Sequence, residues 1–312
     1  MKLSPTASLH KVGNSDAPIT DTVSVFHVPD MMFDRGVRKF MEGGGDPFAY
    51  IRGIGENFQK DADMLVGNLE GPITESLDCQ AKAYSFRFDP SIAALLKRNR
   101  FDAVNLANNH TNDCYGTGIR DTRKYLNEAG IAYFGAHEVS ESVLSKKVGD
   151  TRVAFIGIDE TASSDAQLEP FYAKIVELRQ THDHIIVHIH WGFEYDALQN
   201  ARQSVIGHRL IDSGADVVIG HHPHVVQPIE IYHGKAIFYS LGNFIFDQVA
   251  PRTNIGFAVG SVYRDGNMRF TIFPYTITHA QPELMPHDVM KKFCDNILKN
   301  ISATDTCQFA PK

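Results

Sequence analysis

The chain has 312 residues, of which 43% are apolar and 21% are charged, as is usual for a globular protein in water. This length allows one large α/β domain or two smaller ones, each with a buried core. The formal net charge is −7, so no excess of positive charge points to nucleic acid or an anionic membrane as a partner. Because the sequence also has no basic stripe, a nuclease is disfavoured.

Cysteine usage and hydropathy bear on the cellular compartment. The cysteines Cys79, Cys114, Cys294 and Cys307 form no CxxC pair, which argues against a zinc ribbon. Their spacing is irregular and the chain is large enough to fold without covalent staples, so we favour free thiols in a reducing compartment over disulfides. The N-terminus has no apolar segment of signal-peptide length, and no run reaches the ~20 apolar residues of a membrane helix. We therefore expect a soluble cytoplasmic protein without direct membrane insertion.

Alternating strand and helix patterns begin after a polar stretch at residues 1–20, which we expect to be a flexible N-terminal tail. Short apolar runs predict strands, and amphipathic segments with polar residues or Pro at their start predict helices. Up to residue 228 the expected strands are 22–26, 62–69, 101–106, 131–134, 144–148, 152–156, 185–190 and 215–219, and the expected helices are 89–98, 118–129, 169–179 and 204–213.

From residue 228 onward the chain becomes rich in hairpin patterns. Alternating strands and helices followed by hairpins predict an α/β domain, here residues 21–280, with one mixed sheet or two stacked sheets. Residues 281–312 are expected to form a C-terminal helix and tail. The additional strands are expected at 229–232, 236–239, 256–263 and 268–275.

Three histidines follow the last of the alternating strands. In the stretch Gly220-His221-His222-Pro223-His224, three imidazoles within four residues cannot all point into an apolar core. Neutral imidazole is a common ligand of zinc, iron and manganese. His222 and His224 lie two residues apart, so in an extended segment both would point the same way. A metal site at the carboxyl end of this strand is the first hypothesis.

Four other strand ends also carry polar residues that suit such a site. Ligands gather outside the carboxyl ends of strands in open α/β sheets, so the five ends together predict one shared site. Taken singly, Asp30 or Asn68 has a simpler interpretation as a turn residue or helix cap, and His190 as a packed core histidine. Convergence at five ends argues against these interpretations. The residues are Asp30, Asn68 with Glu70, Asn108-Asn109-His110, His190, and His222 with His224.

Longer motifs extend these strand ends. They are Asn68-Leu69-Glu70-Gly71-Pro72, Asn105-Leu106-Ala107-Asn108-Asn109-His110 with Asp113, His190-Trp191-Gly192-Phe193-Glu194-Tyr195, Gly220-His221-His222-Pro223-His224-Val225, and Tyr239-Ser240-Leu241-Gly242-Asn243-Phe244. In this combination the sequence resembles the calcineurin-like metallophosphoesterase superfamily and, within it, the bacterial CapA family of capsule and poly-gamma-glutamate synthesis proteins. The motifs that carry this resemblance extend over residues 22–247, most of the chain.

The resemblance implies a fold and a set of ligands. The fold would be a four-layer α/β/β/α sandwich of two mixed sheets, with metal bound between the carboxyl ends of the sheets. One or two divalent ions (Mn, Zn or Fe) would serve as cofactor for a metal-dependent hydrolase. By this resemblance the metal ligands are Asp30, Asn68 or Glu70, Asn109, His190, His222 and His224.

Two positions depart from the superfamily pattern. Its first motif, Asp-x-His, reads Asp30-Met31-Met32 here, so the histidine is missing, and His27 could replace it only if the strand bends. Where the superfamily has an aspartate in its second motif, this chain has Asn68, and a neutral amide bridges two cations poorly. Either Glu70 takes over this role, or the site holds one metal firmly and a second one weakly.

Other residues are expected to act on the substrate. His110 would protonate the departing oxygen or nitrogen, and Asp113 either orients the His110 ring or caps the helix that follows. Glu194 and Tyr195 lie where a substrate-facing loop is expected. Asn243 would also reach the substrate if the chain turns just before it.

Two functional classes follow from these residues. Superfamily chemistry suggests a phosphate ester as substrate, whereas the family resemblance points to poly-gamma-glutamate, an amide polymer. We therefore expect a metal-dependent hydrolase or biosynthetic enzyme related to poly-gamma-glutamate synthesis, with a small-molecule or polyglutamate-like substrate. The alternative is a non-catalytic accessory protein that binds such a polymer or a synthase partner, and the altered acidic positions favour it.

Overall fold

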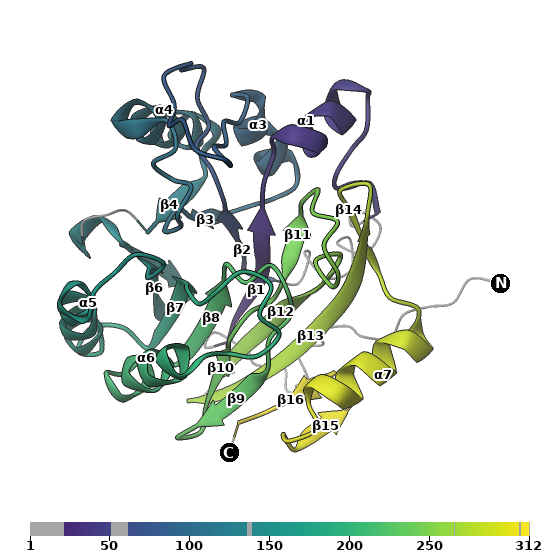
Figure 1. Ribbon diagram of the computed structural model, residues 1–312. Coiled ribbons are helices and arrows are strands. Elements are labelled where there is room, and N and C mark those ends of the chain that lie inside the picture. Colours follow the sequence, from purple (N-terminus) through teal and green to yellow (C-terminus); the bar gives the residue numbers. More distant parts are fainter. Residues whose placement is uncertain (1–21, 51–61, 136–138, 265, 306, 312) are drawn as a thin grey trace.

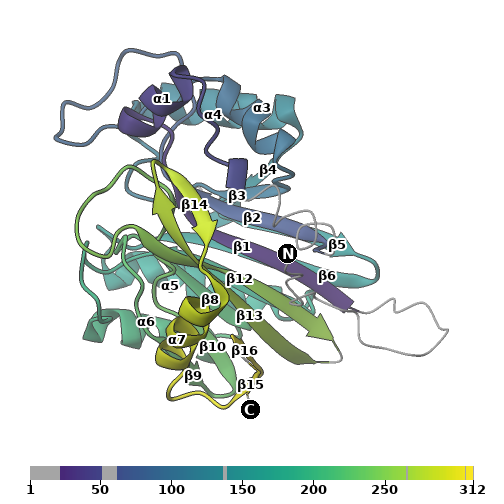
Figure 2. The ribbon, with the colours of Figure 1, turned by 90° about the vertical axis from the view of Figure 1, so that its right-hand side faces the viewer.

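Two β-sheets packed face to face form the centre of the computed structural model, and helices cover the outer face of each sheet (Figures 1 and 2). The structure describes residues 22–50, 62–135, 139–264, 266–305 and 307–311. The tail expected at residues 1–20 lies outside the described residues. The predicted four-layer α/β/β/α sandwich of two mixed sheets is confirmed.

The larger sheet combines parallel and antiparallel pairings. Strands β1 to β4 run parallel, and the antiparallel pair β12–β13 continues the sheet on the other side of β1. Strand β11 also pairs with β1, and β14 with β13. In spatial order the strands are β15 (Ala303–Asp305), β16 (Gln308–Phe309), β13 (Asn267–Thr278), β12 (Ile255–Arg264), β1 (Thr22–Met31), β2 (Met64–Leu69), β3 (Ala103–Asn105) and β4 (Ala132–Phe134), with β11 (Asn243–Ile245) and β14 (Gln281–Leu284) off this path.

The smaller sheet has hairpins at both edges and parallel strands between them. The β5–β6 and β9–β10 hairpins flank the parallel pairs β6–β7, β7–β8 and β8–β10. Most positions of the parallel strands are buried, and apart from the histidines of β7 and β8 most of these positions are apolar or Gly. In spatial order the strands are β5 (Val143–Val148), β6 (Thr151–Asp159), β7 (His184–His190), β8 (Val217–His221), β10 (Lys235–Phe238) and β9 (Ile229–Tyr232).

Helices form the two outer layers (Figure 1). The first three pack on the larger sheet and the next two on the smaller one. Local sequence explains some of their ends: Asn200 and Gln203 form a capping box at the start of α6, and Gly130 ends α4 with a left-handed φ of 67°. The helices are α1 (Arg35–Glu42), α3 (Ser91–Arg98), α4 (Tyr115–Ala129), α5 (Asp165–Leu178), α6 (Ala201–Asp212) and α7 (His287–Ile297), with a 3₁₀ turn at Val139–Glu141.

Residues 281–312 join the larger sheet. Besides α7, which matches the helix expected there, this segment contains three short strands, and two of them, β14 and β16, pair with β13. Cys294 and Phe309 are buried in the layer between the sheets. The domain boundary placed at residue 280 stays a prediction.

All four cysteines form disulfides, Cys79–Cys114 and Cys294–Cys307. The expectation of free thiols is therefore wrong, because the fold brings together cysteines that lie 35 and 13 residues apart. Disulfides persist in oxidising compartments, so the cysteines no longer support a cytoplasmic location. Among the described residues, no helix has both the length and the apolar character needed to cross a membrane.

Removing the Cys294–Cys307 disulfide with the double substitution Cys294→Ser and Cys307→Ser is expected to lower the free energy of unfolding by about 3 kcal/mol. The disulfide closes a loop and so restricts the unfolded chain. Urea unfolding of both proteins without reductant measures the difference, and full reduction should abolish it. Equal stability of the two proteins before reduction would contradict the prediction.

Candidate metal centre

The carboxyl ends of strands from both sheets meet at one edge of the sandwich. Asp30 and Asn68 lie near the ends of β1 and β2, and His190 ends β7. The sheet register pairs Asp30 with Asn68, and His190 with His221. This topology brings Asp30 within hydrogen-bond distance of His222, which comes 192 residues later in the chain.

The histidine cluster turns after β8 instead of continuing as an extended segment. His222 and His224 have φ values of 93° and 57°, in the left-handed region that is costly for residues other than Gly. This turn, and not strand alternation, brings the two ring centroids to 5.9 Å from each other. His221, His222 and His224 are all buried, which differs from the sequence expectation because the interior at this point offers polar partners.

Asp30 is completely buried, and both of its carboxylate oxygens have partners. Asn68 Nδ2 donates to Oδ1 at 2.9 Å, and the backbone N–H of His222 donates to Oδ2 at 3.2 Å. His221 Nδ1 lies 3.1 Å from Oδ1, and His224 Nδ1 lies 3.5 Å from Oδ2. Burial acts to raise the pKa of Asp30, but the neighbouring His221 and His224 imidazoles bring this pKa below its usual value. Asp30 is therefore an ionised carboxylate.

Asn68 is engaged by neighbouring side chains. Its Oδ1 accepts hydrogen bonds from Asn105 Nδ2 at 3.0 Å and from Asn108 Nδ2 at 3.5 Å. Its Nδ2 donates to Asp30, so the amide holds the carboxylate in place. These contacts favour Glu70 over Asn68 as the second acidic position of the site, and the role of Asn68 as a metal ligand stays a prediction.

Glu70 presents a buried carboxylate with no hydrogen-bond partner among the described residues. Its Oε1 lies 3.5 Å from His224 Nε2 and 4.0 Å from His110 Nε2. Burial, and then the negative charge of Asp30, raise the pKa of Glu70 well above its usual value. A buried acid without donors costs free energy unless a cation compensates its charge.

Neutral imidazoles line another side of the centre. His190 Nε2 lies 3.1 Å from His222 Nδ1 and 3.0 Å from Asn109 Oδ1. Burial lowers the pKa of His190 well below its usual value and the pKa of His222 to about 4, so both rings are neutral at pH 7. Each neutral ring offers a lone pair, which is the donor that divalent metals bind.

Two groups of ligand atoms have the spacing of a metal site. One group comprises Glu194, His222 and His224, and the other comprises Asp30, Glu70 and His224. Within each group the ligand atoms lie within 4.8 Å of one another. Because His224 belongs to both groups, the two candidate positions are adjacent.

The residues predicted to bind substrate occupy two different depths. Asn243 is completely buried; its Oδ1 lies 2.9 Å from His224 Nδ1 and its Nδ2 donates to Gln248. Glu194 and Tyr195 are exposed at the rim, and Gln248 Nε2 donates to the Tyr195 hydroxyl. Burial and the charge of Glu194 raise the pKa of Tyr195 to about 12. Asn243 therefore contacts His224, a candidate metal ligand, whereas Glu194 and Tyr195 are open to solvent.

His110 is held by an acid and an aromatic ring. Its Nδ1 lies 2.8 Å from Asp113 Oδ2, and its ring stacks on Phe86 with centroids 4.1 Å apart. Asp113 is buried and pairs with Lys82 Nζ at 2.6 Å. The N-cap residue of α4 is Cys114, which makes no side-chain capping bond. Of the two roles open to Asp113, this geometry favours orientation of the His110 ring.

Two residues without a predicted role lie against the centre. His221 contacts Asp30 and is on the inward face of β8, a position that strand alternation could have revealed. The Arg35 guanidinium lies 5.2 Å from the Phe86 ring centroid and pairs with Asp247. No local pattern in the sequence indicated Arg35, because its neighbours come from distant segments.

The described residues fit a divalent metal ion. Among these residues Glu70 makes no hydrogen bond, Asp30 is ionised, and the neutral imidazoles add nitrogen ligands, a donor set that suits Mn, Fe or Zn. His27 does not replace the superfamily histidine missing at Met32, because its Nδ1 faces His188 instead, at 3.2 Å. The identity and number of the ions stay predictions.

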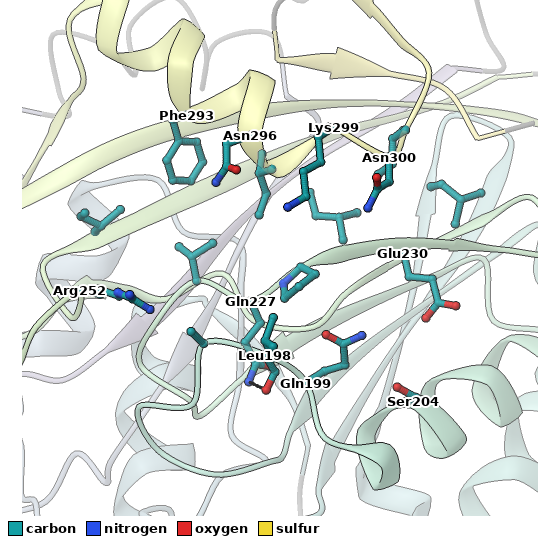
Figure 3. Close-up of a pocket in the computed structure, with 18 of the residues that line it drawn as sticks. Leu198, Gln199, Ser204, Gln227, Glu230, Arg252, Phe293, Asn296, Lys299 and Asn300 are labelled. Atoms are coloured by element: carbon teal, nitrogen blue, oxygen red, sulfur yellow. Dashed lines mark hydrogen bonds between the residues drawn. The ribbon is translucent and has the colours of Figure 1, made fainter.

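A cavity of about 1070 Å³, shown in Figure 3, is lined in part by residues that follow the site motifs in the chain. Its walls include Leu198 and Gln199, which follow the rim residues, and Gln227, which follows the histidine cluster. Lys299, from the segment after α7, closes it on the opposite side (Figure 3). None of the predicted site residues lines this cavity.

The two packed sheets with their outer helices form a metallophosphoesterase-like fold. The structure is similar to a crystal structure of a novel phosphatase from Mycoplasma pneumoniae, with a TM-score of 0.50 over 85% of this chain and 92% of that one. The two sequences are only 11% identical, so this similarity concerns the fold alone.

The chain belongs to the family described as bacterial capsule synthesis protein PGA_cap, whose model matches residues 24–248. It is 32% identical over 294 residues to the PGA biosynthesis protein CapA of Bacillus subtilis (strain 168), covering 87% of this chain and 76% of that protein. It is 30% identical over 280 residues to the capsule biosynthesis protein CapA of Bacillus anthracis, covering 82% and 68%. The family predicted from the motifs is confirmed.

Proposed function

We propose that this protein is a metal-dependent hydrolase that acts in poly-gamma-glutamate capsule synthesis on a polyglutamate-like substrate. The observation that carries the proposal is the buried Glu70 carboxylate, which faces His224 and His110 and has no hydrogen-bond partner in the described part of the chain. Membership of the capsule synthesis family and the similarity to the two CapA proteins support the polymer as the substrate class.

The ligands proposed for the metal are Asp30, Glu70, Asn109, His190, His222 and His224, with Asn68 beside them. When bound, a divalent ion supplies Lewis acidity and charge stabilisation to the bond under attack. The Asp30, Glu70, His190, His222 and His224 side chains are buried, so the chain holds these ligand atoms in place around the ion.

His110 is the proposed proton donor to the leaving group. Its Nδ1 faces Asp113 and its Nε2 faces the centre. The Asp113 carboxylate fixes the ring orientation and stabilises the protonated ring, while Phe86 holds the ring plane. At the rim, the exposed Tyr195 hydroxyl can donate to a substrate carboxylate, and Glu194 can bind a substrate amine.

Replacing His110 by Ala is expected to lower kcat by about 10²- to 10⁴-fold, the usual contribution of a general acid. Bound metal should stay unchanged, because His110 is not among the proposed ligands. The rates are measured with Mn²⁺ on a chromogenic phosphodiester and on poly-gamma-glutamate, with release of new amines as the readout for the polymer. His233→Ala, on an exposed turn between β9 and β10, is the matched control. A metal-loaded wild type without turnover on either substrate would refute the hydrolase.

A second candidate function is polymer binding without catalysis, and the cavity of about 1070 Å³ favours it. Arg252 and Lys299 line this cavity (Figure 3), and neither has an ion-pair partner in the described part of the chain. Poly-gamma-glutamate carries one carboxylate per residue, which such cations would attract. In the experiment above, tight binding of the polymer without turnover, lost on substitution of Arg252 and Lys299 but not of Lys291, would support this candidate.

A further inference from the structure

A line of buried polar side chains leads from the layer between the sheets to Asp30. His27 Nδ1 lies 3.2 Å from His188 Nε2, and His188 Nδ1 lies 3.0 Å from His221 Nε2. At one end, Ser261 Oγ lies 3.0 Å from His27 Nε2; at the other end, His221 Nδ1 lies 3.1 Å from Asp30 Oδ1. All five residues are buried. We refer to Ser261, His27, His188 and His221 as the histidine chain.

The histidine chain crosses a layer that is otherwise largely apolar. Strand alternation places its rings on the inner faces of β1, β7 and β8, where Val25, Ile186 and Ile219 also lie. A buried imidazole costs free energy unless its nitrogens are hydrogen-bonded, and apolar side chains would fill the same space without that requirement. The polar line therefore needs a reason other than packing, and Asp30 is the one candidate ligand that it reaches.

The direction of hydrogen bonding along the chain follows from its end at Asp30. A neutral imidazole has one N–H and one lone pair, and burial lowers the pKa of His27 to about 3, so this ring is neutral at pH 7. The Asp30 carboxylate can only accept, so the proton of a neutral His221 lies on Nδ1, 3.1 Å from Oδ1, although the geometry there falls short of a regular hydrogen bond. With this single proton on His221, its Nε2 accepts from His188 Nδ1, and His188 Nε2 accepts from His27 Nδ1. Ser261 completes the series by donating its hydroxyl proton to His27 Nε2.

The opposite direction is unfavourable at the Asp30 end. In that case the Ser261 hydroxyl would donate to the Val25 carbonyl, 3.2 Å away. Each ring would then carry its proton on Nε2. The bare Nδ1 of His221 would face the carboxylate at 3.1 Å, and two lone pairs at this distance repel each other.

We propose that every proton of the histidine chain points toward Asp30 and that the chain positions the Asp30 carboxylate for the metal. His221 and Asn68 together engage Oδ1, which turns Oδ2 toward His224 and the rest of the centre. His27, His188 and Ser261 are positioning residues, since they act through His221. The positioning role rests on the proposed metal centre, whereas the direction of the protons does not.

The direction can be tested on the unmodified, metal-free protein. Long-range ¹H–¹⁵N correlation spectra of protein labelled with ¹⁵N-histidine distinguish protonated from bare ring nitrogens. We expect the Nδ1–H tautomer for His27, His188 and His221, with assignments from single His→Gln variants. Ser261→Ala removes only one oxygen and should release the fixed tautomer of His27. An Nε2–H tautomer at His188, or a doubly protonated His221, would overturn the proposed direction.

The positioning role is tested by metal binding. His188→Phe is expected to weaken Mn²⁺ binding about 10- to 100-fold, as loss of an outer-shell partner does. His184→Phe is the matched control: His184 lies on the same strand and contacts Tyr263, with ring centroids 4.6 Å apart, outside the histidine chain. Equal weakening in both variants would overturn the positioning role. A wild type that binds no Mn²⁺ would refute the metal centre, while the tautomer result would still decide the direction.

Discussion

Replacing Glu70 by Gln is expected to lower the affinity for Mn²⁺ at least 100-fold, beyond the ~10- to 100-fold loss typical of an outer-shell partner. Glu70 is a buried acid without a hydrogen-bond partner in the described residues, and its neighbour Asn68 is already bonded to Asp30. The substitution keeps the shape of the side chain but removes the negative charge that a divalent cation needs. Elemental analysis after dialysis measures the stoichiometry, and a metal titration measures the affinity.

The same substitution should stabilise the metal-free protein. Burial and the charge of Asp30 raise the pKa of Glu70 well above its usual value, so its stabilising contribution is lost as the pH rises through this pKa in the folded state. At pH 8 with a chelator, Glu70→Gln is therefore expected to raise the free energy of unfolding. Glu75→Gln, an exposed residue in the same loop, should change neither property. Stoichiometric metal retained by the Glu70→Gln protein would exclude Glu70 as a ligand.

Lowering the pH from about 6.5 toward 3 is expected to destabilise the metal-free protein, by about 1.4 kcal/mol per pH unit for each histidine that folding keeps neutral. Burial, and then the nearby His221 imidazole, lower the pKa of His27 from 6.5 to about 3. The unfolded chain binds a proton at His27 below pH 6.5, and the folded chain binds it only near pH 3. This contribution to stability is therefore complete above pH 6.5 and is lost as the pH falls.

Denaturant unfolding at several pH values between 7 and 4, with a chelator, measures this slope. His27→Gln should make the slope shallower by up to about 1.4 kcal/mol per pH unit, whereas His233→Gln on the exposed β9–β10 turn should leave it unchanged. Glu70 changes the pH dependence of stability in the opposite direction, because its pKa is raised in the folded state. The measured slope of unfolding free energy against pH is therefore the sum of the two contributions. A slope that His27→Gln leaves unchanged would contradict a buried, neutral His27.

Much of the site could be predicted because its residues stand next to local signals. Asp30, Asn68, His190 and the histidine cluster each follow an apolar strand pattern, and the carboxyl ends of such strands gather at one edge of a sheet. Asp113 follows His110 by three residues, close enough for contact within one turn. Hydrophobic alternation and short spacing carry this information without knowledge of the fold.

Other features depend on contacts between distant segments. Asn68 and Glu70 were equivalent candidates for the acidic position until the register of β1 and β2 joined Asn68 to Asp30. The four cysteines suggested free thiols by their spacing, and only the packing of their loops and strands paired them. Arg35 reaches its aromatic neighbours across several loops, which no sequence window contains.

The amino-acid sequence by itself determined most of the strand and helix order, the family and the histidines near the metal centre, because these depend on local periodicity and contiguous motifs; helix α1 and the short strands β11, β14, β15 and β16 were not predicted. The tertiary structure decided which acid is left unpaired, which cysteines bond, and that His27, His188 and His221 line up behind Asp30. The physical reason is that hydrogen bonds between sheets depend on strand order and register. These bring residues 161 and 33 positions apart within 3.2 and 3.0 Å of each other.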